Sequence, residues 1–424
     1  MKILFFLAIS LTTMACNEQS KSQLDEAWNS SNDPRQMGFD YFNQTYKYKT
    51  NFETLPKKGE LSQTPWSGDY WATYRGGITF RWPDATDWAE MTPEELEPQY
   101  SYDLITNPFE IVFAGKKKLS PAEKFDLYNG NYSFPLTKME RERTKIMSTV
   151  EGDESYNPDF EIPTWEGLCH AWAPATLQYK APKNVMMMNP HGILVPFGAS
   201  DIKALLTYNF HMVSDQVRTS FLGRRCEANV DHLIEKMNEG KITQEEFRTR
   251  YRKALKSSSC SDTNAGAFHL TLANQIALLD EGFVVDITRD SEVWNQGVYK
   301  YDTTVMREVN EAAPTAAEGT VRAVLVETAM YYVNEVNFSW DGSLGEDDDP
   351  EGIMYYYYWL ELDADDNIIG GEWAKPSEFL EKEDLNIVNG DEKDDRPDFM
   401  WKMEKAPYHE MFKRLEKIYK KSTK

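Results

Sequence analysis

The chain has 424 residues and a formal net charge of −23 at pH 7, because 69 Asp and Glu outnumber 46 Lys and Arg. Nucleic-acid binding needs clustered Lys and Arg, so this balance argues against a nucleic-acid partner and would instead attract lysine-rich partners. Hydrophobic residues make up 41% of the chain, which is enough for a packed core, and the length suggests one large domain or two.

The N-terminus has the features of an export signal. After a short positive start, residues 3–14 form an apolar run that is too short to cross a bilayer but fits a signal h-region. Ala15 and Cys16 follow as in a bacterial lipobox, although Thr13 stands where Leu is usual, and an ordinary cleaved signal peptide is the alternative. We therefore predict a signal peptide over residues 1–15, lipidation of Cys16, and an exported protein of the cell envelope. It is expected to be an outer-membrane lipoprotein anchored in the membrane, or a secreted protein.

The other three cysteines divide into a pair and one remainder. Export implies an oxidising compartment, where disulfides persist, and Cys226 and Cys260 both lie in polar, loop-like sequence. We predict a disulfide between them, which would stabilise the fold by roughly 3–4 kcal/mol on the chain-entropy estimate. Two unpaired surface thiols are the alternative. Cys169 is then left as a free thiol, and nucleophilic catalysis is one reason for an exported protein to keep one.

Several helices and strands are expected along the chain. Residues 120–126 begin a helix, with Ser as N-cap and Pro at the first helical position. Three further stretches have helical patterns, and two stretches after Thr320 are rich in β-branched and aromatic residues, which favours antiparallel strands. The helical stretches are 135–148, 200–206 and 229–256, and the strands are 321–333 and 354–362. The class predicted is α+β.

The predicted organisation is a linker followed by one large catalytic region. Residues 16–64 are polar with little periodicity, so we expect a linker with one short helix near 33–43. The catalytic region is expected over 65–401 and a C-terminal helix or tail over 402–424. The catalytic region divides into an N-terminal part (65–160), a core (161–320) and a β-rich part (321–401).

Cys169 lies in a setting that suits a reactive thiol. A thiol attacks as thiolate and needs a lowered pKa, which a helix N-terminus supplies. Gly167 allows a tight turn, and a helix over 168–179 would put Cys169 in its first turn. Pro174 should kink or break that helix. The alternative is a small buried core residue, which most lone cysteines are.

A general base for this thiol should be a histidine. His170 is a poor base because adjacent helical residues do not face each other. His269 lies in an apolar stretch, 264–274, that favours a strand pointing the imidazole into a cleft, although a helix over 268–279 is also possible. Asp286 interrupts a second apolar run and would orient His269, with a purely structural His–Asp pair as the alternative. Asp290 and Glu292 are alternative acids; the remaining histidines, His191, His211, His232 and His409, lie in turns, polar helices or near the C-terminus.

Several motifs in one order resemble the transglutaminase elicitor family of oomycetes. They are GLCHAWAP from 167, NAGAFH from 264, EVWNQ from 292, YWLELD from 358, GGEW from 370 and RPDFMW from 396. The resemblance covers about 65–401 and implies a papain/transglutaminase-like core, in which a helix bearing Cys packs on an antiparallel sheet bearing His and Asp, with a β-rich C-terminal part. It implies that Cys169 is the nucleophile, His269 the base and Asp286 the orienting acid. Gly297 departs from the family, which continues EVWNQ with Pro.

This resemblance implies a protein-glutamine γ-glutamyltransferase acting on proteins or peptides that bear Gln and Lys. A papain-like cysteine hydrolase and a non-catalytic surface-binding lipoprotein are the alternatives. No cofactor is expected to be required, although calcium is possible because calcium dependence occurs among transglutaminases. The oxygen-rich segment 363–367 lacks the Gly and Glu of an EF-hand and favours a hairpin turn, and 345–350 is expected to be a solvated acidic loop.

Overall fold

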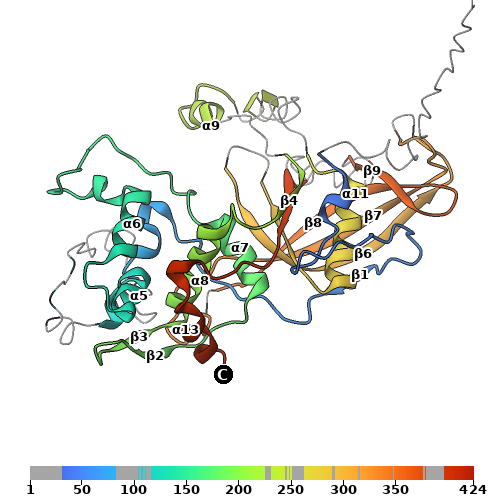
Figure 1. The fold of residues 1–424 in the computed structure, drawn as a ribbon. Helices are drawn as coiled ribbons and strands as arrows, with labels where there is room; N and C mark the ends of the chain where they lie inside the picture. The colour runs from blue at the N-terminus through green and yellow to red at the C-terminus, as the bar shows by residue number, and fades with distance from the viewer. Residues whose placement is uncertain are drawn as a thin grey trace, which may run out of the picture.

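The computed structural model describes residues 31–82, 116–224, 231–243, 262–288, 292–313, 316–346, 348–375 and 396–424, with isolated residues between them (Figure 1). The predicted signal peptide and the residues Cys16, Cys226, Cys260 and Asp290 lie outside the described residues. Lipidation and the disulfide therefore stay predictions. Among the described residues, no helix is both long and apolar enough to cross a membrane.

One antiparallel sheet organises the right-hand part of the molecule (Figure 1). Its strands run in the order β4-β10-β5-β6-β7-β8-β9, and β1 pairs with β6 off this path, so the sheet has eight strands within the described part of the chain. The C-terminal strand β10 lies between β4 and β5, which ties the end of the chain to its middle. The strands are β1 (Lys58–Glu60), β4 (Thr219–Gly223), β5 (Phe283–Asp286), β6 (Asn295–Val309), β7 (Arg322–Val333), β8 (Glu351–Leu362), β9 (Ile368–Trp373) and β10 (Phe399–Met403).

Helices cover both faces of this sheet. Helix α7 (Cys169–Gln178) packs on β5 and β6, where a Cβ at Gly297 would lie 3.2 Å from the carbonyl oxygen of Ala173. Helix α11 (Ala265–Thr271) continues into a π-helical segment, η7 (Leu272–Leu278), and packs against β8 and β9. Gly297 therefore permits a close approach of α7 to the sheet, and no larger residue fits there without movement.

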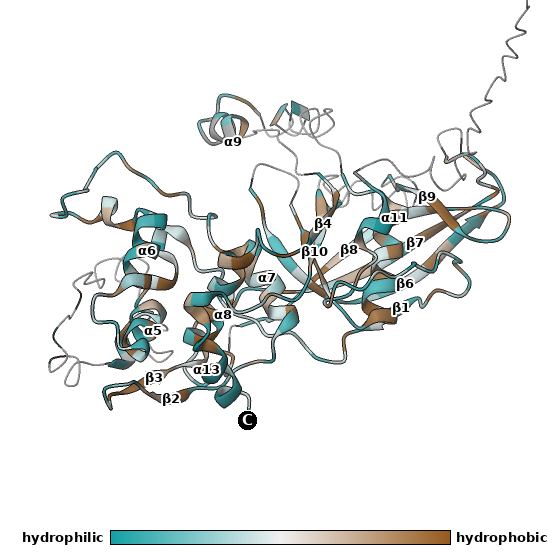
Figure 2. Ribbon diagram, viewed as in Figure 1, coloured by the Kyte–Doolittle hydropathy of each residue, from teal (hydrophilic) through white to brown (hydrophobic). Residues whose placement is uncertain are grey.

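The remaining helices form a second group beside the sheet, except α9, which stands apart above them (Figure 2). Helix α5 begins as predicted, with a capping box. The Ser120 side chain accepts from the backbone N–H of Glu123, and the Glu123 carboxylate accepts from the backbone N–H of Ser120. The helices are α5 (Pro121–Asn129), α6 (Pro135–Thr144), α8 (Ala199–Val213), α9 (Asp231–Asn238) and α13 (Leu415–Ser422), with a hairpin of β2 (Val185–Met188) and β3 (Leu194–Phe197) below them. Short 3₁₀ turns are η1 (Pro34–Met37), η2 (Thr73–Arg75), η3 (Gly77–Thr79), η5 (Lys116–Lys118), η6 (Ile146–Thr149) and η9 (Glu410–Phe412). The mixture of helices and antiparallel sheet is an α+β fold, as predicted.

Two sequence-based expectations about local structure are wrong. The stretch 264–274 is helical rather than a strand, because Asn264 caps α11 by accepting from the backbone N–H groups of Gly266 and Ala267. The described part of the predicted linker, residues 31–64, belongs to the packed body: Phe39 and Phe52 are buried there. The hairpin turn expected at 363–367 is confirmed, since it joins β8 to β9.

Candidate active site

Cys169 is the first residue of α7, as the sequence predicts. Backbone N–H groups in the first turn of a helix lack helical partners and carry partial positive charge, so this position favours an anion. The helix continues through Pro174 instead of breaking there. Proline has no N–H, so the carbonyl of His170 loses its helical hydrogen bond, and the buried packing of Ala173 and Pro174 keeps the helix together.

The turn before Cys169 is fixed by the backbone of Tyr70. The N–H of Leu168 donates to the carbonyl of Tyr70 at 2.7 Å. A Cβ on Gly167 would lie 2.4 Å from the Tyr70 ring, so only glycine allows this close passage. The Tyr70 ring in turn lies 6.0 Å from that of Trp294. The start of α7 is therefore held between the segment around residue 70 and the segment that leads into β6.

The thiol of Cys169 makes two polar contacts with that second segment. Its S–H donates to the carbonyl of Val293 at 3.5 Å, and the Nδ2 of Asn295 donates to Sγ at 3.6 Å. The other end of the Asn295 amide accepts from Nε1 of Trp401 at 2.8 Å. Trp401, on β10, therefore orients the amide so that its donor faces the sulfur. Cys169 itself is only 8% exposed.

Asp286 lies at the same edge of the sheet, directly across from Asn295 in the β5–β6 pairing. Directly opposed residues in antiparallel strands hold their Cβ atoms about 4.5–5.5 Å apart, so the carboxylate and the amide are neighbours. The carboxylate accepts from the backbone N–H of Trp294 at 3.0 Å and from the Thr288 hydroxyl at 3.1 Å. The structure thus places Asp286 and Asn295 next to each other at Cys169, where Asp286 was predicted to orient His269 instead.

The electrostatics of the thiol follow from these neighbours. Burial raises the pKa of Cys169, hydrogen bonds from the backbone and side chain of Asn295 lower it, and the negative charges of Asp286 and Glu335 raise it, with a raised pKa as the net result. Glu335 accepts from Nε2 of Gln296 at 3.0 Å, and burial raises its own pKa. The resting thiol therefore carries its proton at neutral pH.

His269 does not meet Cys169. Val298 and Tyr332 are paired, so their side chains point to the same face of the sheet. Gly297, next to Val298, points to the other face, which α7 covers. Tyr358 pairs with Val326, which lies an even number of residues from Tyr332 and therefore shares its face. His269 hydrogen-bonds to Tyr358 and so lies across the sheet from the thiol.

The surroundings of His269 are those of a core residue. Its Nδ1 is 2.9 Å from the hydroxyl of Tyr358, and its Nε2 has no hydrogen-bond partner among the described residues. Burial lowers the pKa of His269 to about 3, with a smaller contribution from Lys57. The expectation of a strand histidine oriented by Asp286 is therefore wrong: the predicted residues do not assemble as a Cys–His–Asp triad.

His170 and Glu292, which the sequence offered as a poor base and an alternative orienting acid, are engaged elsewhere. Nε2 of His170 lies 3.0 Å from Nδ1 of His211, and burial lowers the pKa of His170 to about 4. Glu292, one of the alternative acids, accepts from the indole Nε1 of Trp294. No histidine within the described ranges is hydrogen-bonded to the sulfur, which leaves Asp286 as the charged group that acts on it most directly.

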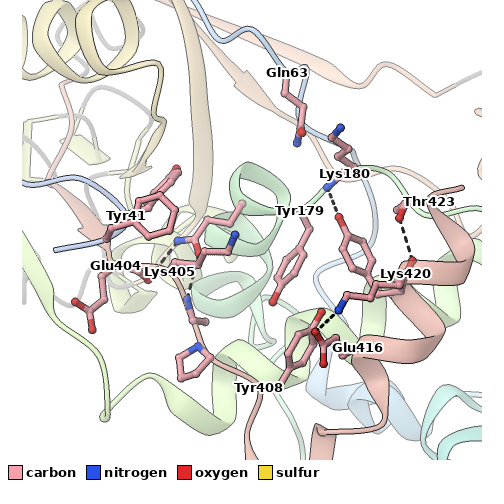
Figure 3. Close-up of a pocket in the computed structure, with 15 residues that line it drawn as sticks. Tyr41, Gln63, Tyr179, Lys180, Glu404, Lys405, Tyr408, Glu416, Lys420 and Thr423 are labelled. Atoms are coloured by element: carbon pink, nitrogen blue, oxygen red, sulfur yellow. Dashed lines mark hydrogen bonds and ion pairs between the residues drawn. The ribbon is translucent and has the colours of Figure 1, made fainter. Parts of the chain in front are cut away.

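Within the described residues no metal site includes the thiol, and a hollow elsewhere on the molecule does not reach it. In the described part of the chain, no group of three or more His, Cys, Asp or Glu is placed to hold a metal ion. A hollow of about 840 Å³ lies at the other end of α7, around Tyr179, Tyr408 and Tyr419 (Figure 3). Its lining contains neither Cys169 nor Asp286, so the hollow is separate from the candidate site.

Sequence reasoning missed three polar neighbours of the thiol: Asn295, Trp401 and Glu335. A signal existed for two of them, because Asn295 and Trp401 lie in the EVWNQ and RPDFMW motifs that carry the family resemblance.

Comparison with known proteins gives one family and one fold. The family model described as "Transglutaminase elicitor" matches residues 38–104 and 138–421. The crystal structure of the GP42 transglutaminase from Phytophthora sojae is similar in fold, with a TM-score of 0.57 and 24% sequence identity over 90% of this chain and 95% of that one. No curated protein matches the chain.

Proposed function

Because the chain belongs to the transglutaminase elicitor family, we propose that it is a protein-glutamine γ-glutamyltransferase with Cys169 as its nucleophile. The observation that carries the proposal is the contact of the Cys169 sulfur with the oriented amide of Asn295, next to Asp286, at the start of α7.

The first half-reaction forms a thioester. The Cys169 proton passes to the carboxylate of Asp286, and the sulfur attacks the carbonyl carbon of a glutamine carboxamide. The tetrahedral oxyanion receives hydrogen bonds from the Asn295 amide and from backbone N–H groups in the first turn of α7. The C–N bond then breaks, and ammonia leaves with the proton that Asp286 returns.

The second half-reaction transfers the acyl group. A neutral primary amine attacks the thioester carbon, the C–S bond breaks, and an isopeptide or amide bond forms. The proton lost by the amine passes to Asp286 and back to the sulfur, which restores the thiol. Water in place of the amine gives deamidation, so a hydrolase reaction uses the same groups.

The test is incorporation of a fluorescent primary amine into a glutamine-bearing donor protein, with the Cys169→Ala variant in parallel. We expect label incorporation by the parent and none by the variant. Deamidation without incorporation would replace the transferase by a hydrolase. An absence of both reactions, together with a Cys169 that iodoacetamide does not label in the native protein, would refute catalysis at this thiol.

A further inference from the structure

The β6–β7–β8 part of the sheet presents aromatic side chains to solvent. Ile353, Tyr355, Tyr357 and Trp359 alternate along β8 on one face, and Tyr355 is 54% exposed and Ile353 40%. Tyr331 of β7 is the cross-strand neighbour of Ile353. We call this set the aromatic face; it comprises Tyr331, Ile353, Tyr355, Tyr357 and Trp359. Monomeric proteins seldom expose such large side chains side by side without a partner.

The aromatic face lies on the same side of the sheet as the site of Cys169. Tyr331 points to the face opposite that of Tyr332, which is the face of Gly297 and hence of α7. Strand β6 connects the two sites, because it begins with Asn295 at the thiol and continues to Asp302. Asp302 pairs with Ala329, and Ala329 pairs with Tyr355 of the aromatic face. At about 3.3 Å per residue these two points lie roughly 23 Å apart, which an extended peptide of about eight residues spans.

The charges around the aromatic face suit a cationic polypeptide. Asp302, Glu327 and Glu351 share this face of the sheet, since they pair with or alternate with its members. Two of its cations lie over aromatic rings: Lys300 is 4.7 Å from the centroid of Tyr331, and Arg307 is 5.0 Å from that of Trp359. A third, Lys58 on β1, pairs across the strands with Asp302, and Glu60 on the same strand pairs with Lys300. Glu351 and Glu327 accept from the hydroxyls of Tyr299 and Tyr357 and keep their negative charge, so the carboxylates of this face still outnumber its cations.

The same preference holds at the thiol end. Glu335 and Asp286 both act on Cys169 through their negative charge, and Asp69 acts in the same way on Glu335. A lysine ammonium arriving there meets negative charges that attract it. The exposed aromatic face and the acidic groups beside the nucleophile thus lie on the same side of the sheet.

We propose that the aromatic face binds an extended, lysine-rich polypeptide and presents one of its lysines to Cys169 as the acyl acceptor. The assignment of acceptor rests on the proposed function, whereas the binding itself does not. Tyr355 is the central contact, because it is the most exposed ring of the face, and its ring takes a lysine ammonium as those of Tyr331 and Trp359 take Lys300 and Arg307. Trp, Tyr and Arg are also the residues that dominate binding energy at interfaces.

The binding test uses the full chain with Cys169→Ala, so that no turnover occurs. A fluorescein-labelled peptide of about ten residues, alternating lysine with serine, is long enough to reach from Cys169 to Tyr355, and a matched peptide carries glutamate in place of lysine. Fluorescence anisotropy should show binding of the lysine peptide alone. Adding Tyr355→Ala should raise its Kd about threefold to fivefold, the range expected for one exposed cation–π contact. Glu327→Gln should weaken binding at low salt and have little effect at high salt.

Matched controls keep the result specific. Tyr156 is 41% exposed in a segment away from the sheet, so Tyr156→Ala should leave the Kd unchanged. Tyr355→Leu preserves an apolar side chain without a π face and should weaken binding like Tyr355→Ala while melting at the parent temperature. Equal Kd values for the parent and both Tyr355 variants, equal affinity for the glutamate peptide, or no binding at all would overturn the proposal.

A kinetic arm separates this proposal from the proposed function. In the chain with Cys169 intact, Tyr355→Ala should raise KM for the lysine peptide and leave kcat and the rate with a small diamine unchanged. An unchanged KM for the peptide would overturn the role in acceptor binding. Loss of all transfer in the parent would instead refute the proposed function, and the anisotropy titration would still decide whether the face binds lysine-rich chains.

Discussion

The two faces of the central sheet carry the two residues that sequence reasoning joined into one site. On one face, α7 places Cys169 at a helix start, beside the polar ends of β5 and β6. On the other, α11 buries His269 against Tyr358 and Phe52, with one ring nitrogen lacking a described partner. Both residues lie in apolar stretches near a helix start, so the local sequence does not separate the reactive residue from the structural one. The strand pairing decides which face of the sheet each of them occupies.

Replacement of Cys169 and of His269 gives the strongest contrast between the faces. Cys169→Ala should abolish acyl transfer, a loss of at least about 10³-fold, because no other group supplies the nucleophile. His269→Gln should keep turnover within about threefold of the parent and reduce the free energy of unfolding by about 1–3 kcal/mol, the cost of disturbing a buried hydrogen bond. Amine incorporation and urea unfolding measure the two effects. A His269→Gln variant that folds normally but has lost activity would restore His269 to the site.

Asp286 tests the chemistry on the α7 face. Asp286→Asn removes a negative charge that raises the pKa of Cys169, so iodoacetamide should label the thiol faster at pH 8. The same change removes the proposed proton acceptor, so turnover should fall by about 10²- to 10⁴-fold. Glu335→Gln is the matched control: it also removes a charge acting on the thiol and should speed labelling, yet keep turnover. If both variants lost turnover equally, Asp286 would have no special place in proton transfer.

The sequence was sufficient for the parts of the fold that local chemistry determines. The capping box at Ser120, the helix start at Cys169 and the strands at 321–333 and 354–362 all follow from residue types within one or two turns. The helix at 265–271 was harder, because an alternating apolar stretch suits either structure and the decision rests on Asn264 capping two backbone N–H groups.

The site could be predicted only in part, for a physical reason. Cys169 and Asp286 stand out as a lone thiol and an acid inside an apolar run. Asn295 reaches the site because β6 pairs with β5. Trp401 reaches it because β10, more than a hundred residues later in the chain, inserts between β4 and β5. Such long-range pairing leaves no local pattern, so the partners of the thiol became visible only in three dimensions.

The buried His269 on the α11 face should make the stability of the protein depend on pH. Burial lowers the folded-state pKa of His269 to about 3, below the value of about 6.5 in an unfolded chain. The unfolded chain then binds a proton that the folded one does not, so stability is present above pH 6.5 and is lost as pH falls toward 3. Between pH 6.5 and 5 this single group removes up to about 2 kcal/mol.

Urea unfolding at pH 7 and pH 5 measures this loss. His269→Gln should lose less stability over that interval than the parent does, whereas His232→Gln, at an exposed position on α9, should behave like the parent. The His170–His211 pair adds a similar dependence in all three proteins, because burial lowers both pKa values to about 4. An identical pH dependence in the parent and His269→Gln would mean that His269 is not buried as a neutral group.

The smallest expected effect is on turnover, and it is measured by replacing one tryptophan on each face of the sheet. Trp401 orients the Asn295 amide on the α7 face, and Trp373 donates to the carbonyl of Thr263 just before α11. Trp401→Phe removes only the indole donor, so the amide loses its fixed orientation and turnover should fall about twofold to tenfold, the value of one neutral hydrogen bond. Trp373→Phe removes an equivalent bond and should lower the melting temperature without changing kcat. Equal losses of kcat in both variants would show that the amide's orientation is not what Trp401 contributes, because the two substitutions would then act through stability alone.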